Sequence, residues 1–405
     1  MINIKDLARD LQPCLVEWRR HFHRYPELSW QEHETSQTVA RMLTQIGIPI
    51  RKAAGTGVIG SIAGKKPLPV VALRADMDAL PVLESSDIPF CSQNAGIMHA
   101  CGHDAHTAML LGAAHVLSQC RDAFCGEIRL IFQPAEEDLT GAKAMIAEGV
   151  LKDAGAIFGI HVWSHLDAGK IAIDAGPRMA SADKFVIRVR GKGGHGAAPH
   201  HGIDAIPAAA SVIANLQTIV SRHTSPFETL VITIGKISGG TAFNVLCAEV
   251  EMEGTVRCMK PGIRDQIPEA IERVVVHSCG AHRAEGRVEY IARTPVVVND
   301  SDLSQIARTA AEALFGPDVL FSMGPSIGSE DFAWYGEKVP AVFAFLGTGK
   351  SGGKVAPHHS PGFDLDESVL WMGTALYAKF AMDCLGVHGA HPISSRPTQF
   401  LKLKK

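Results

Sequence analysis

Hydrophobic and polar positions follow two different periods along the first 176 residues. Residues 36–48 and 106–120 carry apolar positions at helical spacing, and the second segment is apolar nearly all round, which predicts a buried helix. Short β-rich runs lie at residues 58–64, 68–76, 126–137 and 154–163. This alternation of strands and helices is typical of an α/β domain with a largely parallel sheet and helices on both faces.

A different pattern begins after Gly176. Strand-like segments with period-two alternation and two helical segments follow in the order β-α-β-β-α-β, and the first helix is expected to begin near Asp204. This order predicts an inserted α+β domain with a ferredoxin-like arrangement. From residue 296 the α/β pattern returns. We therefore predict a catalytic domain made of residues 1–176 and 296–388, an inserted domain of residues 177–295, and a polar tail of residues 389–405.

Charge and cysteine usage narrow the class of protein. The formal net charge is -3, so no basic field exists to attract nucleic acid or an anionic membrane surface. No run of about 18 apolar residues is present, so we expect no membrane span. The nine cysteines have no spacing pattern, and the N-terminus has no continuous apolar segment typical of a secretory signal. Free thiols predict a reducing compartment, and we expect a cytoplasmic protein.

Residues that bind metals or transfer protons gather at the ends of the predicted strands, where an open α/β sheet places its ligands. They are Asp76 and Asp78, Glu136 and Glu137, and His161, joined by Cys101 and His103 of "MHACGHDAH" and by His358 and His359 of "PHHSP". Thiolate, imidazole and carboxylate are the usual zinc ligands, and carboxylate also suits manganese. The donors exceed what one closed tetrahedral site needs, which favours two metals sharing a bridging ligand. Asp104 is expected to be the N-cap of the buried helix.

Two adjacent acids follow the apolar strand "IRLIF", behind a proline. Two carboxylates held together in a cleft cannot both ionise freely. One can be neutralised by a metal while the other accepts protons, which is the division of labour that a hydrolase needs.

Several longer motifs, in order over nearly the whole chain, make the sequence resemble a known superfamily. They include "HRYPELSWQEHET", "RADMDALP", "HACGHDAHTAMLLGAA", "FQPAEE", "GIHVW", "GKGGHGAAPHHGIDAI" and "HSPGFDLDE". The chain resembles the aminoacylase, carboxypeptidase G and hippurate hydrolase superfamily of metal-dependent amidohydrolases. The most similar branch contains hippurate hydrolases, N-acyl-L-amino acid amidohydrolases and auxin-conjugate hydrolases.

The resemblance implies a site with two divalent metal ions, Zn²⁺ or Mn²⁺. The implied ligands are Cys101, His103, Glu137, His161 and His359. The family pattern His-x-Pro selects His359, and His358 stands one place early as the alternative. Glu136 would be the general base that takes a proton from the metal-bound water and passes it to the leaving amine. Asp78 would orient a ligand or support a turn.

The inserted domain is similar to the family's lid and dimerisation domain, which implies a homodimer or a higher homo-oligomer. His195 of "GGHGA" would polarise the scissile carbonyl, with Asn244 assisting. Arg257 of "GTVR" is a candidate partner for a substrate carboxylate, because its planar guanidinium suits that group.

The leading hypothesis is hydrolysis of an N-acyl amino acid, such as a hippurate-like substrate, to a carboxylic acid and a free amino acid. Dipeptidase or carboxypeptidase activity at the same site is an alternative. A thiol hydrolase, with Cys101 as nucleophile and His103 as base, is a second class of reaction. A binding or metal-storage protein without catalysis is a third, since a fold does not guarantee a function.

Overall fold

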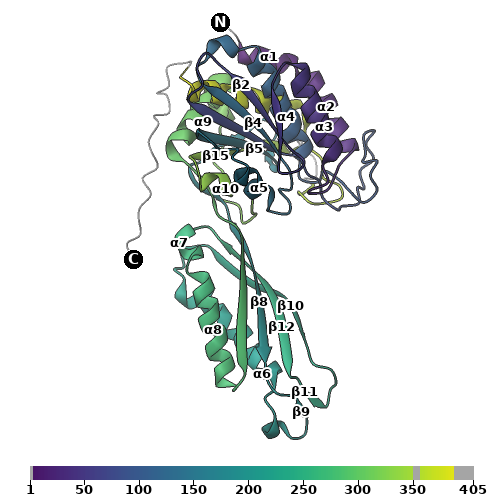
Figure 1. Ribbon diagram of the computed structural model, residues 1–405, viewed down its shortest axis with the longest axis vertical. Coiled ribbons are helices and arrows are strands. Elements are labelled where there is room, and N and C mark those ends of the chain that lie inside the picture. The colour runs from purple at the N-terminus through teal and green to yellow at the C-terminus, as the bar shows by residue number, and fades with distance from the viewer. Residues whose placement is uncertain (1–2, 350–355, 387–405) are drawn as a thin grey trace. The chain divides into compact units, whose positions relative to one another are not determined.

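The computed structural model describes residues 3–349 and 356–386 and divides into two compact units (Figure 1). Of the described residues, the first unit comprises 3–176, 298–323, 334–349 and 356–386. The inserted unit comprises Pro177–Val297 and Gly324–Ala333, so the chain enters it twice. The expected polar tail, residues 389–405, lies outside the described residues.

A seven-stranded sheet forms the centre of the first unit, in the order β1-β2-β4-β3-β5-β15-β6. The strands are β1 (Ile50–Ala53), β2 (Gly57–Ala63), β3 (Val70–Asp76), β4 (Glu127–Gln133), β5 (Ala154–Asp167), β6 (Ile171–Ala172) and β15 (Ala341–Gly349). The four central strands, β4, β3, β5 and β15, are parallel, and antiparallel strands flank them. The predicted α/β class with a largely parallel sheet is confirmed.

Helices bury this sheet. They are α1 (Ile4–Asp10), α2 (Gln12–Arg24), α3 (His33–Gln45), α4 (His103–Ser118), α5 (Gly141–Ala147), α9 (Ser301–Phe315) and α11 (Leu370–Cys384). β3 is buried at every residue, as its unbroken apolar run predicts. α4 is buried at all positions except His115 and Ser118. It packs against α11, where Thr374 Oγ1 donates to Met109 O at 3.0 Å. The prediction of a buried helix here is confirmed.

The inserted unit is a four-stranded antiparallel sheet with two long helices. Its strands are β8 (Ser181–Arg190), β10 (Leu230–Gly239), β12 (Glu249–Cys258) and β13 (Glu285–Thr294), in the order β10-β12-β8-β13. The helices are α6 (Ala205–Thr218) and α8 (Ile267–Ala281), and both contribute to its apolar core. α6 has Asp204 as its N-cap, which confirms the expected start.

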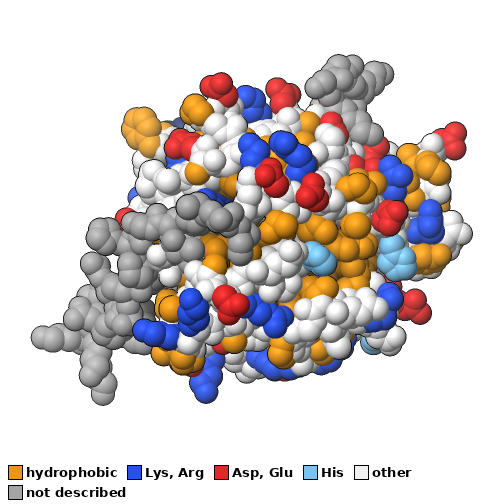
Figure 2. Space-filling model, turned by 90° about the horizontal axis from the view of Figure 1, so that it is seen from above, with side chains coloured by type: hydrophobic (Ala, Val, Ile, Leu, Met, Phe, Trp, Pro, Cys, Tyr) orange, Lys and Arg blue, Asp and Glu red, His pale blue; other side chains and the backbone are white. Residues whose placement is uncertain are grey.

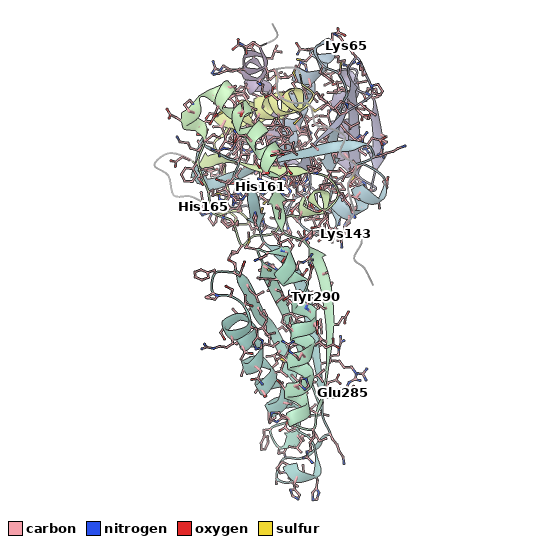
Figure 3. The ribbon with its side chains drawn as sticks, turned by 90° about the vertical axis from the view of Figure 1, so that its left-hand side faces the viewer. Lys65, Lys143, His161, His165, Glu285 and Tyr290 are labelled. Carbon is pink, nitrogen blue, oxygen red and sulfur yellow. The ribbon has the colours of Figure 1, made fainter. Side chains whose placement is uncertain are left out.

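A buried charge cluster joins three elements of this unit. Tyr290, labelled in Figure 3, donates its hydroxyl to Asp183 at 2.9 Å. Arg264 binds the same carboxylate through two nitrogens at 2.8 and 2.9 Å. Because the fully buried Asp183 has these partners, the cluster ties β8 to β13 and to the short helix α7 (Pro261–Arg264).

Acidic and basic side chains are interspersed on the face of the molecule shown in Figure 2, around an area of hydrophobic side chains. This mixture on the viewed face is in keeping with the small net charge of -3.

Candidate metal centre

The candidate ligands lie at the carboxyl edge of the parallel strands of the first unit. β3 and β4 run parallel to each other, and β3 runs parallel to β5, so the segments after them meet at one edge. β5 continues beyond His161 to Asp167, so the prediction that His161 stands at a strand's end is wrong. Its pairing with β3 nevertheless ends at Gly159, which places His161 (Figure 3) just past the last shared pair.

Gly102 turns the chain into α4 and brings two candidate ligands to this edge. Its φ is +92°, a conformation that glycine adopts without strain. A Cβ on this residue would lie 2.3 Å from Val162 Cγ2, so a side chain would clash with β5. The turn therefore places Cys101 and His103, on either side of Gly102, against the strand that carries His161.

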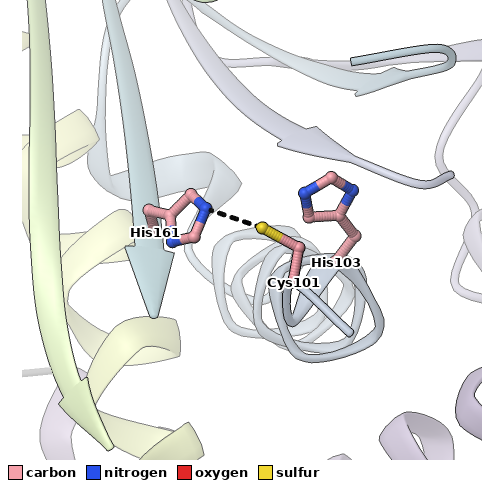
Figure 4. Close-up of side chains that lie close together, drawn as sticks. All are labelled: Cys101, His103 and His161. Carbon is pink, nitrogen blue, oxygen red and sulfur yellow. Dashed lines mark hydrogen bonds between the residues drawn. The ribbon is translucent and has the colours of Figure 1, made fainter. Parts of the chain in front are cut away.

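Cys101, His103 and His161 form a buried group of sulfur and imidazole donors (Figure 4). Cys101 Sγ lies 3.5 Å from His161 Nε2, and the three donor atoms all lie within 4.8 Å of one another. His103 Nδ1 donates to the carbonyl of Asp78 at 2.9 Å. Its Nε2 is buried and has no hydrogen-bond partner among the described residues. A buried nitrogen without a partner is costly unless it binds something.

Glu137 and His359 form a second group with the same cysteine. Their donor atoms and Cys101 Sγ lie within 4.8 Å of one another, and His359 Nε2 is 3.5 Å from Glu137 Oε1. His358 points elsewhere, because its Nε2 donates to the carbonyl of Val162 at 3.1 Å. Of the two adjacent histidines, the structure therefore places His359 among the donors.

The pKa shifts of Cys101 and His161 indicate that both side chains are neutral when no metal is bound. Burial raises the pKa of the Cys101 thiol well above its usual range, and Glu137 raises it further. Burial, with His106 and His358 nearby, holds the pKa of His161 well below its usual range. A thiol nucleophile needs the opposite of the Cys101 shift, a lowered thiol pKa. A neutral imidazole and a thiol that loses its proton to a metal are instead what a metal site requires.

Asp78 holds both glutamates and the ring of His103. Its two carboxylate oxygens accept the backbone N–H groups of Glu136 and Glu137, each at 3.0 Å. Its Oδ1 lies 3.3 Å from His103 Nδ1, and Ser29 Oγ donates to Oδ2 at 2.7 Å. Burial would raise the pKa of Asp78, but the bonds from His103 and Ser29 lower it. Asp78 is therefore an anion that fixes the geometry of the pair.

Asp104 is not the N-cap of α4, so that prediction is wrong. Gly102 occupies the N-cap, and Asp104 lies inside the first turn. Its carboxylate accepts from Arg19 Nε and lies beside His23 Nδ1, each at 2.8 Å, and all three side chains are buried. One carboxylate oxygen is thus engaged by α2, and the other accepts from the N–H of Ala105 in its own helix at 2.9 Å.

Further site residues carried no sequence signal that singled them out. Arg19 and His23 belong to an ordinary amphipathic helix. Ser29 lies in a turn, and His106 follows His103 by one helical turn, a spacing that could have indicated a shared face.

The remaining predicted site residues belong to the inserted unit, where they lie in two separate places. His195 pairs with Val245 between two short strands, β9 (Gly194–His195) and β11 (Val245–Leu246), and Gly196 N donates to Asn244 O at 2.8 Å. Arg257 lies near the C-terminal end of β12, where it pairs with Ala182 of β8. Its Nη1 donates to Thr255 Oγ1 at 2.6 Å, and burial lowers its pKa.

A family model for "Peptidase family M20/M25/M40" matches residues 72–383, which is most of the chain. The protein belongs to this peptidase family. Its catalytic members are metal-dependent amidohydrolases and peptidases, and the candidate groups of donors support binding of divalent metal by this chain.

The sequences of named relatives are similar to this one over most of its length. "Thermostable carboxypeptidase 1" of Saccharolobus solfataricus is 40% identical over 385 residues, 94% of this chain and 97% of that protein. "N-acyl-L-amino acid amidohydrolase" of Geobacillus stearothermophilus is 46% identical over 303 residues, 74% of this chain and 82% of that protein. A solved structure described as a dinuclear metal binding peptidase, from Bacillus subtilis, superimposes with a TM-score of 0.84 at 37% identity, covering 93% and 99% of the two chains.

Within residues 3–349 and 356–386, no helix has the length and apolar character needed to cross a membrane.

Proposed function

We propose that this M20 family member hydrolyses the amide bond of N-acyl amino acids, releasing a carboxylic acid and a free amino acid. The observation that carries the proposal is the pair of donor groups that share Cys101, with Glu136 beside them. The relative named N-acyl-L-amino acid amidohydrolase supports the substrate class.

The residues fit two divalent ions, Zn²⁺ or Mn²⁺. One would be held by Cys101, His103 and His161, and the other by Glu137, His359 and the shared cysteine. The unpartnered Nε2 of His103 and the neutral His161 suit this use. When bound, such a pair polarises a carbonyl and lowers the pKa of water.

Glu136 is proposed as the base that takes a proton from the attacking water and later delivers it to the leaving amine. Its side chain is 7% exposed, and Oε2 lies 4.0 Å from His103 Nε2. Asp78 fixes the backbone N–H groups of both Glu136 and Glu137, so the base and the neighbouring ligand keep a constant separation. Such positioning lets one carboxylate hold metal while the other exchanges protons.

We further propose that two copies associate through the inserted unit. Arg257 and Glu249 lie eight positions apart in β12, which is about 26 Å along a strand. His195 lies beyond the Glu249 end, so one small substrate cannot touch both Arg257 and His195 of one inserted unit. Phe243 is fully exposed beside Asn244, and β10 is an edge strand of its sheet. Exposed apolar side chains and a sheet edge are both surfaces that a second copy can cover.

The test is elemental analysis of protein purified without a histidine tag, followed by a panel of N-acyl amino acids and dipeptides. We expect close to two metals per chain and release of amino acid from the N-acyl panel. Glu136→Gln should keep the metal and lose turnover; unchanged turnover would falsify the role of Glu136. Mixing Glu136→Gln with His195→Ala chains should restore activity only if a site uses residues of two copies.

Carboxypeptidase-type activity is the second candidate, supported by the relative named thermostable carboxypeptidase. Faster release of amino acids from peptides than from N-acyl amino acids would favour it. Loss of activity on chelation, with recovery on adding Zn²⁺ or Mn²⁺, separates both candidates from a thiol hydrolase.

A further inference from the structure

The backbone N–H and carbonyl of Val162 are held by three histidines. Its N–H donates to His106 Nε2 at 2.9 Å. Its carbonyl lies 2.6 Å from His161 Nδ1 and 3.1 Å from His358 Nε2. An amide nitrogen can only donate and a carbonyl oxygen can only accept, so these contacts assign the protons. His161 carries its hydrogen on Nδ1, which leaves Nε2 bare where it faces Cys101.

His106 is in turn oriented by a buried carboxylate. Because its Nε2 accepts from Val162, its hydrogen lies on Nδ1, which is 2.6 Å from Asp76 Oδ1. Arg74 Nη1 donates to the other oxygen of Asp76 at 2.7 Å. Asp76, His103 and His106 have donor atoms within 4.8 Å of one another, as a metal site would. Both nitrogens of His106 are nevertheless occupied, so His106 is a support and not a ligand.

His358 binds the same carbonyl as His161. Its Nδ1 lies 3.4 Å from Ser164 Oγ, and its ring packs against Trp163 and Phe363 with centroids 5.1 and 4.9 Å away. Because the Val162 carbonyl can only accept, the ring of His358 donates through Nε2. In the sequence "PHHSP", the first histidine therefore binds the backbone, and only the second lies among the candidate metal ligands.

We propose that His106 and His358 are positioning residues that clamp the backbone N–H and carbonyl of Val162 and thereby aim His161 Nε2 at the metal centre. The Val162 carbonyl is the acceptor for His161 Nδ1, so a displacement of this stretch of backbone would turn the imidazole. Asp76 acts through His106 by fixing its tautomer. A metal-bound histidine held in this way has a fixed orientation and a more basic nitrogen. The inference rests on the metal site of the proposed function, but not on its substrate.

Substitutions of His106 test the clamp because two amides each mimic one ring nitrogen. Glutamine places its amide near the position of Nε2 and can still accept from Val162, whereas asparagine reaches only the position of Nδ1. We expect His106→Asn to weaken Zn²⁺ binding by about 10–100-fold and His106→Gln to weaken it less. The dissociation constant is measured by chelator competition on the metal-free full chain. His115→Asn, at a half-buried position of the same helix, is the matched control.

A second substitution guards against a folding defect. His358→Phe keeps a ring against Trp163 and Phe363 but removes the donor to Val162. It should weaken Zn²⁺ binding and shift the thiolate charge-transfer band of the Co²⁺-loaded protein, with an unchanged circular dichroism spectrum. Folded His106→Asn and His358→Phe proteins with wild-type affinity and an unshifted band would overturn the inference. Failure of the wild type to bind Zn²⁺ would overturn the proposed metal site as well, whereas binding without N-acyl hydrolysis would overturn the substrate alone.

Discussion

Replacing Arg19 with methionine is expected to destabilise the first unit by about 3–5 kcal/mol, because it leaves a buried carboxylate without its main cation. Arg19 Nε binds Asp104 Oδ2 at 2.8 Å, and both side chains are fully buried. Arg19 Nη1 also binds Glu367 at 3.1 Å. Methionine preserves the length of the side chain, so the loss is mainly electrostatic. At about 1.4 kcal/mol for each factor of ten, the unfolding constant should rise by roughly a hundredfold to a few thousandfold.

The measurement is urea unfolding of the metal-saturated protein followed by tryptophan fluorescence. Arg20→Met is the control, because Arg20 is adjacent and binds the same Glu367 at 2.6 Å, but its side chain is 44% exposed. An exposed pair contributes less than about 1 kcal/mol. Equal losses in the two variants would refute the reasoning that burial sets the cost. The double variant Arg19→Met/Asp104→Leu should recover part of the stability, since it removes both buried charges together.

Three other outcomes are expected. Asp78→Asn should lower metal affinity or turnover by about 10–100-fold, because one of the two oxygens that accept backbone N–H groups becomes an NH₂ group, which can only donate; equilibrium dialysis and initial rates measure this. Burial would raise the pKa of Glu84, but hydrogen bonds from His23 and neighbouring groups lower this pKa to about 2. The contribution of the Glu84 carboxylate to folding stability is therefore complete above its pKa in the unfolded chain and is lost as the pH falls toward 2. Glu84→Gln should therefore reduce stability in thermal melts at pH 6 and change nothing at pH 2. After chelation, Cys101 should resist iodoacetamide at neutral pH, because burial raises its thiol pKa; rapid labelling, read by mass spectrometry, would contradict this.

The fold could be predicted because the burial of a strand or helix determines the apolar pattern within that one segment of sequence. A strand covered on both faces must be apolar throughout, as β3 is, and a helix enclosed on nearly every side must resemble α4. The start of α6 followed from Asp204, whose side chain caps its own helix. Such signals are local and can therefore be recognised in a short stretch of sequence.

The residues that hold the ligands in place could not be identified from short stretches of sequence. His106 binds a backbone N–H that is 56 positions away, and Arg19 binds Asp104 across 85 positions. Asp104 looked like a cap because its type and place fit one, but Gly102 took that position with a positive φ. Which partner a polar side chain selects depends on segments that only the folded chain brings together. The roles of His195, Asn244 and Arg257 stay predictions.

The position of β15 has a consequence for synthesis of the chain. This strand lies between β5 and β6 in the sheet, yet it follows the inserted unit in sequence. While the ribosome is still making residues 168–340, β5 has an open edge on that side, and the nascent inserted unit can complete its own sheet first. An open edge invites pairing with other chains, so translation that stops before Ala341 should yield aggregates instead of a smaller soluble enzyme.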